Sequence, residues 1–161
     1  MNELMIALEA MDPNALAAAI AASVGLIAVI ALSGLIRYLM IAIGYSKMYR
    51  KAGESGWKAF IPVFNTYNNY KISWNGKLFF LYAALFIASS FLGSAEGAMA
   101  LAAGAVSLGI IILAVMQNVK MAKCFGKGAG TGILLILFPG ITSLVLGLGK
   151  AEFLGNETEN D

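Results

Sequence analysis

Four long stretches without a charged side chain constrain this chain more than any other feature of its sequence. They cover residues 13–36, 78–95, 97–119 and 128–149. A helix needs about 20 apolar residues to cross the roughly 30 Å hydrocarbon core of a bilayer. The composition agrees, because 60% of the 161 residues are hydrophobic and only 12% are charged, against roughly a quarter in soluble domains. The sequence therefore predicts an all-α integral membrane bundle of four transmembrane helices.

The predicted spans lie at about 15–45, 78–95, 97–119 and 130–149, in a single transmembrane domain over 1–155 that precedes a polar acidic tail at 156–161. The apolar pattern resumes after Arg37, so we expect the first helix to continue until Gly53 ends it in a left-handed cap. Pro139 interrupts the fourth span. A kink is the simpler expectation there, and a broken helix that forms an ion or substrate site is the alternative.

Basic and acidic residues divide between the two sides of these spans. Six basic residues lie between the first and second spans: Lys47, Arg50, Lys51, Lys58, Lys71 and Lys77. Three more lie between the third and fourth: Lys120, Lys123 and Lys127. Basic residues of short loops stay on the cytoplasmic side. Both loops are therefore expected to be cytoplasmic, and both termini, which carry most of the acidic residues, are expected outside.

A basic cytoplasmic face also attracts anionic lipid headgroups, at roughly 1 kcal/mol for each basic residue near the surface. The candidate lipid-facing residues are Lys47, Arg50, Lys51, Lys58, Lys120, Lys123 and Lys127. The simpler interpretation is that these charges only set the topology. Arg37 is different, because it lies inside the first predicted span. It is expected to extend to the interface, and the alternative is a functional site within the membrane.

The segment after the first helix is too polar to span but carries aromatic residues at helical spacing. We expect a helix, a break at Pro62 and a second helix, lying at the cytoplasmic interface as an interfacial helical segment. The alternative is a re-entrant loop whose asparagines line a polar cavity. The candidate interfacial or partner-binding residues are Trp57, Phe60, Pro62, Phe64, Asn65, Tyr67, Asn69 and Trp74.

Catalytic chemistry finds little support in this sequence. The chain has no histidine, which excludes a Ser/His/Asp triad and any zinc site built with imidazole. Ser46 precedes Lys47 directly, and neighbours in sequence do not face each other on a helix. We therefore expect no enzyme activity, no cofactor and no metal site. The basic residues adjoin the spans, so we expect no nucleic-acid binding.

Three groups of residues resemble a family of small bacterial membrane proteins of unknown function. They are the AGESGW run at 52–57 with Ile61, Pro62 and Asn65, the KCFGKGAG run at 123–130, and the GLG and FLG runs that begin at Gly147 and Phe153. Members of that family are often automatically labelled signal peptidase I. The resemblance implies a protein of the bacterial cytoplasmic membrane and no established activity. Phe64 and Lys150 depart from the residues usual in that family.

Two functions follow from these observations. The first is a non-enzymatic membrane component, a subunit or assembly protein whose basic cytoplasmic face binds anionic lipid or a partner. The second is a pore or a small-solute or ion transporter, which Arg37, Pro139 and the asparagine-rich segment would serve. Glycine and other small residues on the third and fourth spans permit close helix packing. A homo-oligomer or a place in a membrane complex is therefore also expected.

Overall fold

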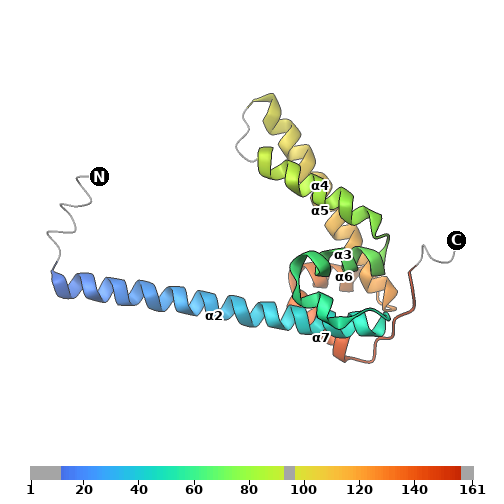
Figure 1. The fold of residues 1–161 in the computed structure, drawn as a ribbon, viewed down its shortest axis with the longest axis horizontal. Helices are drawn as coiled ribbons and strands as arrows, with labels where there is room; N and C mark the ends of the chain where they lie inside the picture. The colour runs from blue at the N-terminus through green and yellow to red at the C-terminus, as the bar shows by residue number, and fades with distance from the viewer. Residues whose placement is uncertain (1–11, 93–96, 157–161) are drawn as a thin grey trace. The chain divides into compact units, whose positions relative to one another are not determined.

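The structure, a computed structural model, describes residues 12–92 and 97–156, and within these ranges it is helical and contains no strand (Figure 1). Its elements are α2 (Pro13–Lys51), the short 3-10 helix η1 (Gly56–Phe60), α3 (Pro62–Ser73), α4 (Lys77–Leu92), α5 (Ala98–Cys124), α6 (Ala129–Leu137) and α7 (Pro139–Leu148). The prediction of an all-α fold is confirmed.

Two of the described helices are long and apolar enough to cross a membrane: Pro13–Lys51, with 39 residues, and Met99–Cys124, with 26. The helices Lys77–Leu92 and Pro139–Leu148 are apolar but shorter. The predicted second span is described as far as Leu92, and its last residues lie outside the described ranges. The described residues therefore contain two candidate spans, and the expected four are not confirmed.

The chain divides into two units, residues 1–38 and 39–161. The described part of the first unit is the beginning of α2, and nearly all of its side chains are exposed. Ile20, Ile27 and Leu35, for example, are each more than half exposed. A helix that is apolar on all sides normally lies in lipid or against other helices.

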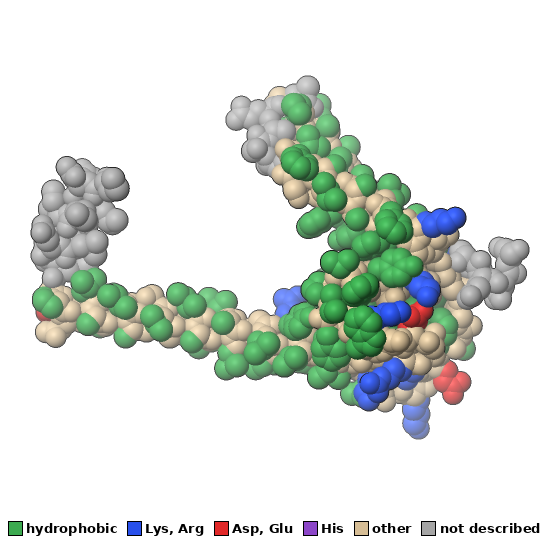
Figure 2. Space-filling view, viewed as in Figure 1, with side chains coloured by type: hydrophobic (Ala, Val, Ile, Leu, Met, Phe, Trp, Pro, Cys, Tyr) green, Lys and Arg blue, Asp and Glu red, His purple; other side chains and the backbone are tan. Residues whose placement is uncertain are grey.

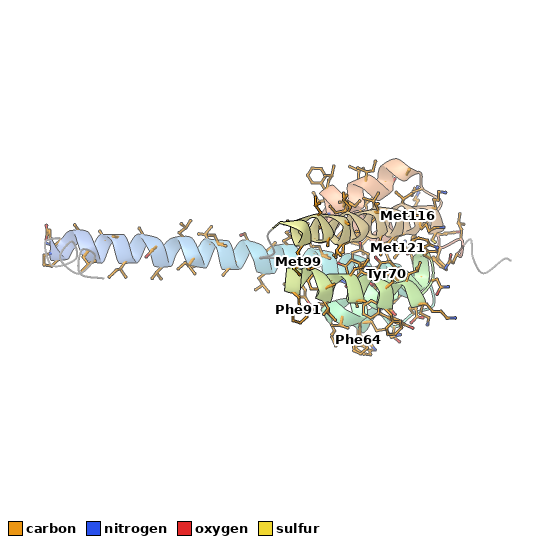
Figure 3. The ribbon with its side chains drawn as sticks, turned by 90° about the horizontal axis from the view of Figure 1, so that it is seen from above. Phe64, Tyr70, Phe91, Met99, Met116 and Met121 are labelled. Atoms are coloured by element: carbon orange, nitrogen blue, oxygen red, sulfur yellow. The ribbon has the colours of Figure 1, made fainter. Side chains whose placement is uncertain are left out.

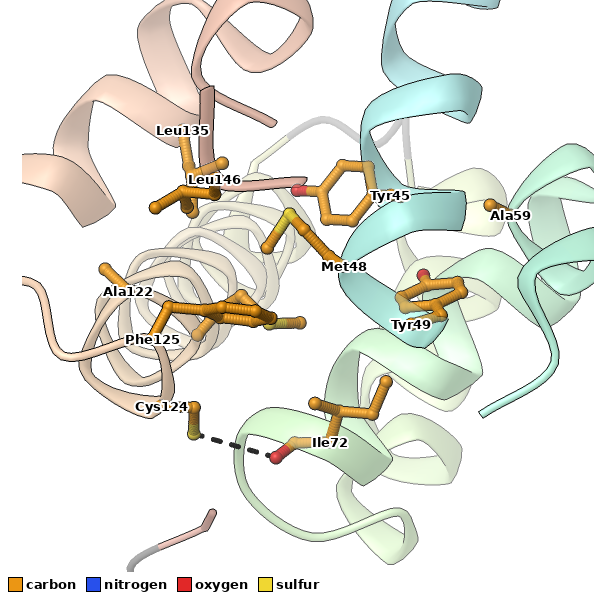
Figure 4. Close-up of a cluster of buried hydrophobic side chains, with 11 residues drawn as sticks. Tyr45, Met48, Tyr49, Ala59, Ile72, Ala122, Cys124, Phe125, Leu135 and Leu146 are labelled. Atoms are coloured by element: carbon orange, nitrogen blue, oxygen red, sulfur yellow. Dashed lines mark hydrogen bonds between the residues drawn. The ribbon is translucent and has the colours of Figure 1, made fainter. Parts of the chain in front are cut away.

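The second unit has a single hydrophobic core, to which α2, α3, α5, α6 and α7 all contribute (Figure 4). Met48 and Tyr49 of α2 lie in its centre beside Phe125, which follows α5. Leu135 of α6 and Leu146 of α7 close one side of the core. Because these residues lie far apart in the sequence, the core depends on long-range packing.

Glycine ends two of the helices that meet at this core. After α2, Gly53 adopts a positive φ of 77°, and Glu54 N–H donates to Tyr49 O at 2.8 Å. After α5, Gly126 adopts a φ of 66°, and Lys127 N–H donates to Ala122 O at 2.9 Å. Both are Schellman caps, which satisfy carbonyls that a helix end leaves without partners. The prediction that Gly53 ends the first helix is confirmed.

The predicted fourth span is a hairpin of two short helices, α6 and α7, so the expectation of one helix over 130–149 is wrong. Pro139 has no N–H to continue the hydrogen bonding of α6, and it is the first residue of α7. Lys127 and Leu146 line the same groove, although a continuous helix would separate them by about 28 Å. The Thr142 hydroxyl donates to Leu134 O at 3.0 Å and satisfies a carbonyl at the end of α6.

Close backbone contacts hold this α6–α7 hairpin in the second unit. A Cβ added to Gly132 of α6 would lie 2.5 Å from the Cα of Val119 in α5. A Cβ added to Gly147 of α7 would lie 2.5 Å from the carbonyl oxygen of Gly44 in α2. Of the small residues expected to permit close helix packing, Gly147 of the fourth predicted span does so within this chain, whereas a Cβ added to Gly104 of the third would have nothing within 4 Å.

The segment after α7 returns to the end of α5. Leu154 N–H donates to Cys124 O at 2.7 Å, and the rings of Phe153 and Phe125 meet edge to face at 5.6 Å. Asn156 is buried and donates to Trp74 O. Residues 151–156 therefore lie at the same end of the unit as the basic 120–127 loop. The tail at 157–161 lies outside the described residues.

Candidate functional site

The segment from η1 to α3 has an exposed aromatic face. Pro62 is the first residue of α3, where its missing N–H is not needed. Trp57 and Phe64 are 55% and 45% exposed, and their rings meet edge to face at 5.6 Å. Phe64 points away from the helices, as Figure 3 shows, and Phe60 is also exposed. Tyr67 is half-buried, with its ring against Phe79 of α4.

A second face of α3, with Asn65 and Asn69, lies against Tyr49 of α2. The hydroxyl of Tyr49 donates toward Asn65 O and Asn69 Oδ1, both at 2.8 Å, and also contacts Asn65 Oδ1. Asn69 Nδ2 donates to Asn65 Oδ1 at 3.4 Å. Tyr49 itself is fully buried. Three acceptor oxygens therefore surround one phenolic proton inside the protein.

Two further polar groups near this face have no hydrogen-bond partner within the described residues. Asn68 is fully buried, and neither its amide nitrogen nor its amide oxygen is paired. The hydroxyl of Tyr70 is likewise buried and unpaired. An unpaired buried polar group costs about 1 to 3 kcal/mol, so these groups are the least satisfied part of the unit.

The polar face continues toward α5. Ser73 Oγ donates to Asn69 O at 2.5 Å and accepts from Gln117 Nε2 at 3.4 Å. Cys124 Sγ lies 3.7 Å from Ile72 O as a buried thiol. We call Tyr49, Asn65, Asn68, Asn69, Ser73 and Gln117 the amide cluster. Its amide and hydroxyl groups offer hydrogen bonds without formal charge.

An acidic residue organises the turn before this segment. Glu54 accepts from Lys58 at 2.6 Å and from Lys71 at 2.5 Å. The hydrogen bond from Lys58, followed by the one from Lys71, lowers the pKa of the Glu54 carboxyl. Lys58, a predicted lipid-facing residue, is thus paired within the protein.

Two more of the predicted residues meet at the end of α3. The ammonium of Lys120 lies over the ring of Trp74, 5.2 Å from its centroid. The Trp74 carbonyl accepts from Asn156, which fixes the segment after α7 to this place. Trp74 therefore joins α3, α5 and the C-terminal segment.

The sequence places Lys51 among the candidate lipid-facing residues, but in the structure its ammonium is bound within the protein. Its ammonium donates to Leu146 O, Gly149 O and Ala151 O, each at 2.8 Å. A lysine ammonium has three donors, so all of them are used within the protein. The carbonyl end of a helix also attracts positive charge. Lys51 therefore caps α7 and has no donor left for a lipid phosphate.

The other predicted basic residues are exposed. In the second unit these are Lys47, Arg50, Lys123 and Lys127. Figure 2 shows basic side chains gathered over the compact part of this unit, while the projecting α4–α5 hairpin shows hydrophobic side chains. Arg37 is exposed on α2 in the first unit.

Sequence reasoning missed Tyr49, Gln117 and the role of Glu54. Tyr49 follows Tyr45 by one helical turn, which could have indicated a buried face at the end of the first helix. Gln117, with Asn118 directly after it, follows a mostly apolar run in the same helix, which also could have marked an inward face. The described residues contain no group of three or more His, Cys, Asp or Glu that could hold a metal ion.

Residues 57–156 match the model of a family described as a family of unknown function (DUF5684). No curated protein and no solved structure matches this chain. The matched range includes α3 to α7 and the aromatic face, and it begins after Tyr49 and Glu54.

Proposed function

This chain belongs to the DUF5684 family of unknown function, and from its own residues we propose that it is a non-enzymatic integral membrane component. It would act as a subunit or assembly protein of the bacterial cytoplasmic membrane. Its basic end would lie among the cytoplasmic headgroups and bind anionic lipid or a partner.

The observation that supports this proposal most is the exposure of large apolar side chains on helices long enough to span. Val29 and Leu32 of α2 are at least 60% exposed, and so are Leu101 and Leu108 of α5. Continuous apolar surface of this extent marks a membrane or protein contact. Polar contacts are concentrated instead around α3 and the helix ends.

The exposed aromatic face suits the headgroup region. Tryptophan prefers this depth because its ring is apolar and its N–H is polar. Lys47 and Arg50 are exposed on the last turns of α2, and long basic side chains of this kind reach phosphates from within the interface. The aromatic face and these cations would together hold the segment at the surface.

We propose a revised topology on the same grounds. In this topology, α2 crosses the membrane once. Helix α4 crosses it outward and α5 crosses it back, and the α6–α7 hairpin enters the membrane from the cytoplasmic side and returns to that side. The N-terminus would then lie outside. Residues 151–156 would lie inside with the 120–127 loop, because the two segments contact each other.

Tryptophan fluorescence tests the position of the aromatic face, because the chain has only two tryptophans. The variant Trp74→Phe leaves Trp57 as the sole reporter, and Trp57→Phe leaves Trp74 as the matched control. In proteoliposomes, lipids brominated near the headgroup should quench Trp57 strongly. They should quench Trp74 less, because Lys120 covers its ring. Quenching of Trp57 by aqueous iodide and not by brominated lipid would refute the interfacial position.

Transport is the second candidate, and the amide cluster favours it. A fully buried Asn68 that has no hydrogen-bond partner among residues 12–92 and 97–156 is costly in a purely structural core. Flux of ions or small solutes in proteoliposomes distinguishes the two functions, since a structural subunit should give none. If flux is found, Asn68→Leu should abolish it while Trp57→Phe should not.

A further inference from the structure

One groove in the second unit combines an apolar wall with a cation at its end. It lies between α6 and α7 and has a volume of about 450 Å³. Its lining residues are Lys127, Thr131, Leu134, Phe138, Ile141, Thr142, Val145 and Leu146. The volume falls within the range of about 300 to 1,000 Å³ that is usual for small-molecule sites.

The groove is polar at one end and apolar along the rest. Lys127 and Thr131 lie at the start of α6, whereas Phe138 lies at the apex of the hairpin. Thr131 and Phe138 are separated by about 10 Å along the helix. The hydroxyl of Thr142 donates to Leu134 O. The middle of the groove therefore offers a ligand few hydrogen-bonding groups.

The polar end is built to receive a negative charge. Lys127 is exposed and forms no ion pair within residues 12–92 and 97–156. The N-terminus of α6 lies at the same end, and Gly128, which precedes the helix, provides no side-chain cap. A Cβ added to Gly128 or Gly130 would have nothing within 4 Å, so this end is open. Helix N-termini and lysines both favour phosphate groups.

We infer that the groove between α6 and α7 binds one anionic phospholipid, with an acyl chain along the hairpin and its phosphate at Lys127 and the start of α6. This inference rests on the proposed membrane function and names the lipid site within it. The occupant follows from charge complementarity. A neutral apolar ligand would make no ionic contact with Lys127, and a free phosphate would make no contact with the apolar wall of the groove.

A second groove in the same unit serves as an internal control. It lies between α3 and α4, has a volume of about 400 Å³ and is lined by Pro62, Val63, Thr66, Phe79, Tyr82, Ala83, Phe86 and Ile87. None of these side chains is charged. It can accept an acyl chain but has no means of selecting a headgroup by charge.

Native mass spectrometry of the full chain in mild detergent tests the site. The protein is titrated with phosphatidylglycerol and with phosphatidylcholine of the same acyl chains. Lys127→Gln should lower the preference for phosphatidylglycerol about fivefold, the equivalent of about 1 kcal/mol for one basic residue. Lys77→Gln, which removes an exposed lysine at the start of α4, should leave that preference unchanged.

A second pair of variants tests the apolar part of the groove. Val145→Trp should fill it and reduce the retention of phosphatidylglycerol, and Ala83→Trp should fill only the control groove and leave retention unchanged. If Val145→Trp fails to fold, Val145→Cys replaces it, and its alkylation should slow when phosphatidylglycerol is added. Native Cys124 is buried and should not interfere.

The possible failures are distinguishable. A parent protein without any preference for phosphatidylglycerol would overturn both this site and the proposed lipid-binding basic face. A parent preference that Lys127→Gln retains would overturn the site alone. Equal retention of phosphatidylglycerol by Val145→Trp and Ala83→Trp would likewise overturn the site. So would an alkylation rate of Val145→Cys that does not change when phosphatidylglycerol is added.

Discussion

Replacing Lys51 by methionine tests the contact that fixes the end of the α6–α7 hairpin. Methionine preserves most of the aliphatic chain and removes the ammonium, so the carbonyls of Leu146, Gly149 and Ala151 lose their donor. A hydrogen bond to a charged group contributes about 1.5 to 3 kcal/mol. Water can replace the ammonium at the exposed Gly149 contact, so the two part-buried contacts give an expected loss of about 3 to 6 kcal/mol.

Thermal unfolding in detergent, followed by circular dichroism, should show this loss as a lower Tm. For a chain of this size, 1 kcal/mol corresponds to about 2 to 4 °C, which gives a decrease of roughly 6 to 24 °C. Hydrogen exchange should locate the effect, with faster exchange in peptides from α7 and the segment that follows it. The release of helix-end carbonyls loosens these parts first.

Lys47→Met is the matched control, because Lys47 is exposed one helical turn earlier on α2. It removes the same charge from the same helix without releasing a carbonyl. We expect its Tm to change by less than about 2 °C, as is usual for surface substitutions. An equal decrease for Lys47→Met and Lys51→Met would show that net charge matters and that the cap does not.

Three further predictions concern other parts of the molecule. In a Cys124→Ser background, a cysteine at Asn160 should react with an impermeant maleimide only after the membrane is opened; labelling of intact cells would contradict the revised topology. The lowered pKa of Glu54 stabilises the turn fully above pH 4.5, its ordinary pKa, and the contribution is lost as the pH falls through the lowered value. Proteolysis within 53–76 should therefore accelerate in acid for the parent, while Glu54→Gln should be cleaved faster already at neutral pH and change less on acidification. Gly132→Ala should destabilise the unit by about 1 to 3 kcal/mol, because its Cβ would overlap the backbone of Val119; an unchanged Tm would show that α6 can shift freely.

Local signals in the sequence determined the helices themselves. The length of the charge-free stretches predicted α2 and α5, because a helix in lipid depends on a continuous apolar run. Gly53 marked the end of α2, since few other residues adopt its positive φ. The aromatic spacing around Pro62 predicted the helix break there. These features depend on neighbours within one or two turns, so a single sequence contains them.

Tertiary contacts decided the remaining features, for physical reasons that the sequence does not contain. Pro139 can kink or break a helix, and the sequence alone does not say which. The close approach of Gly132 to Val119 and of Gly147 to Gly44 fixes where the folded-back hairpin packs. Lys51 resembles the other basic residues in sequence, and its role arises because three carbonyls from residues about 100 positions away converge on it. Asn68 likewise lies inside because other elements of the unit cover its face of α3. A side chain's partners depend on which distant segments meet, and that is settled when the core forms.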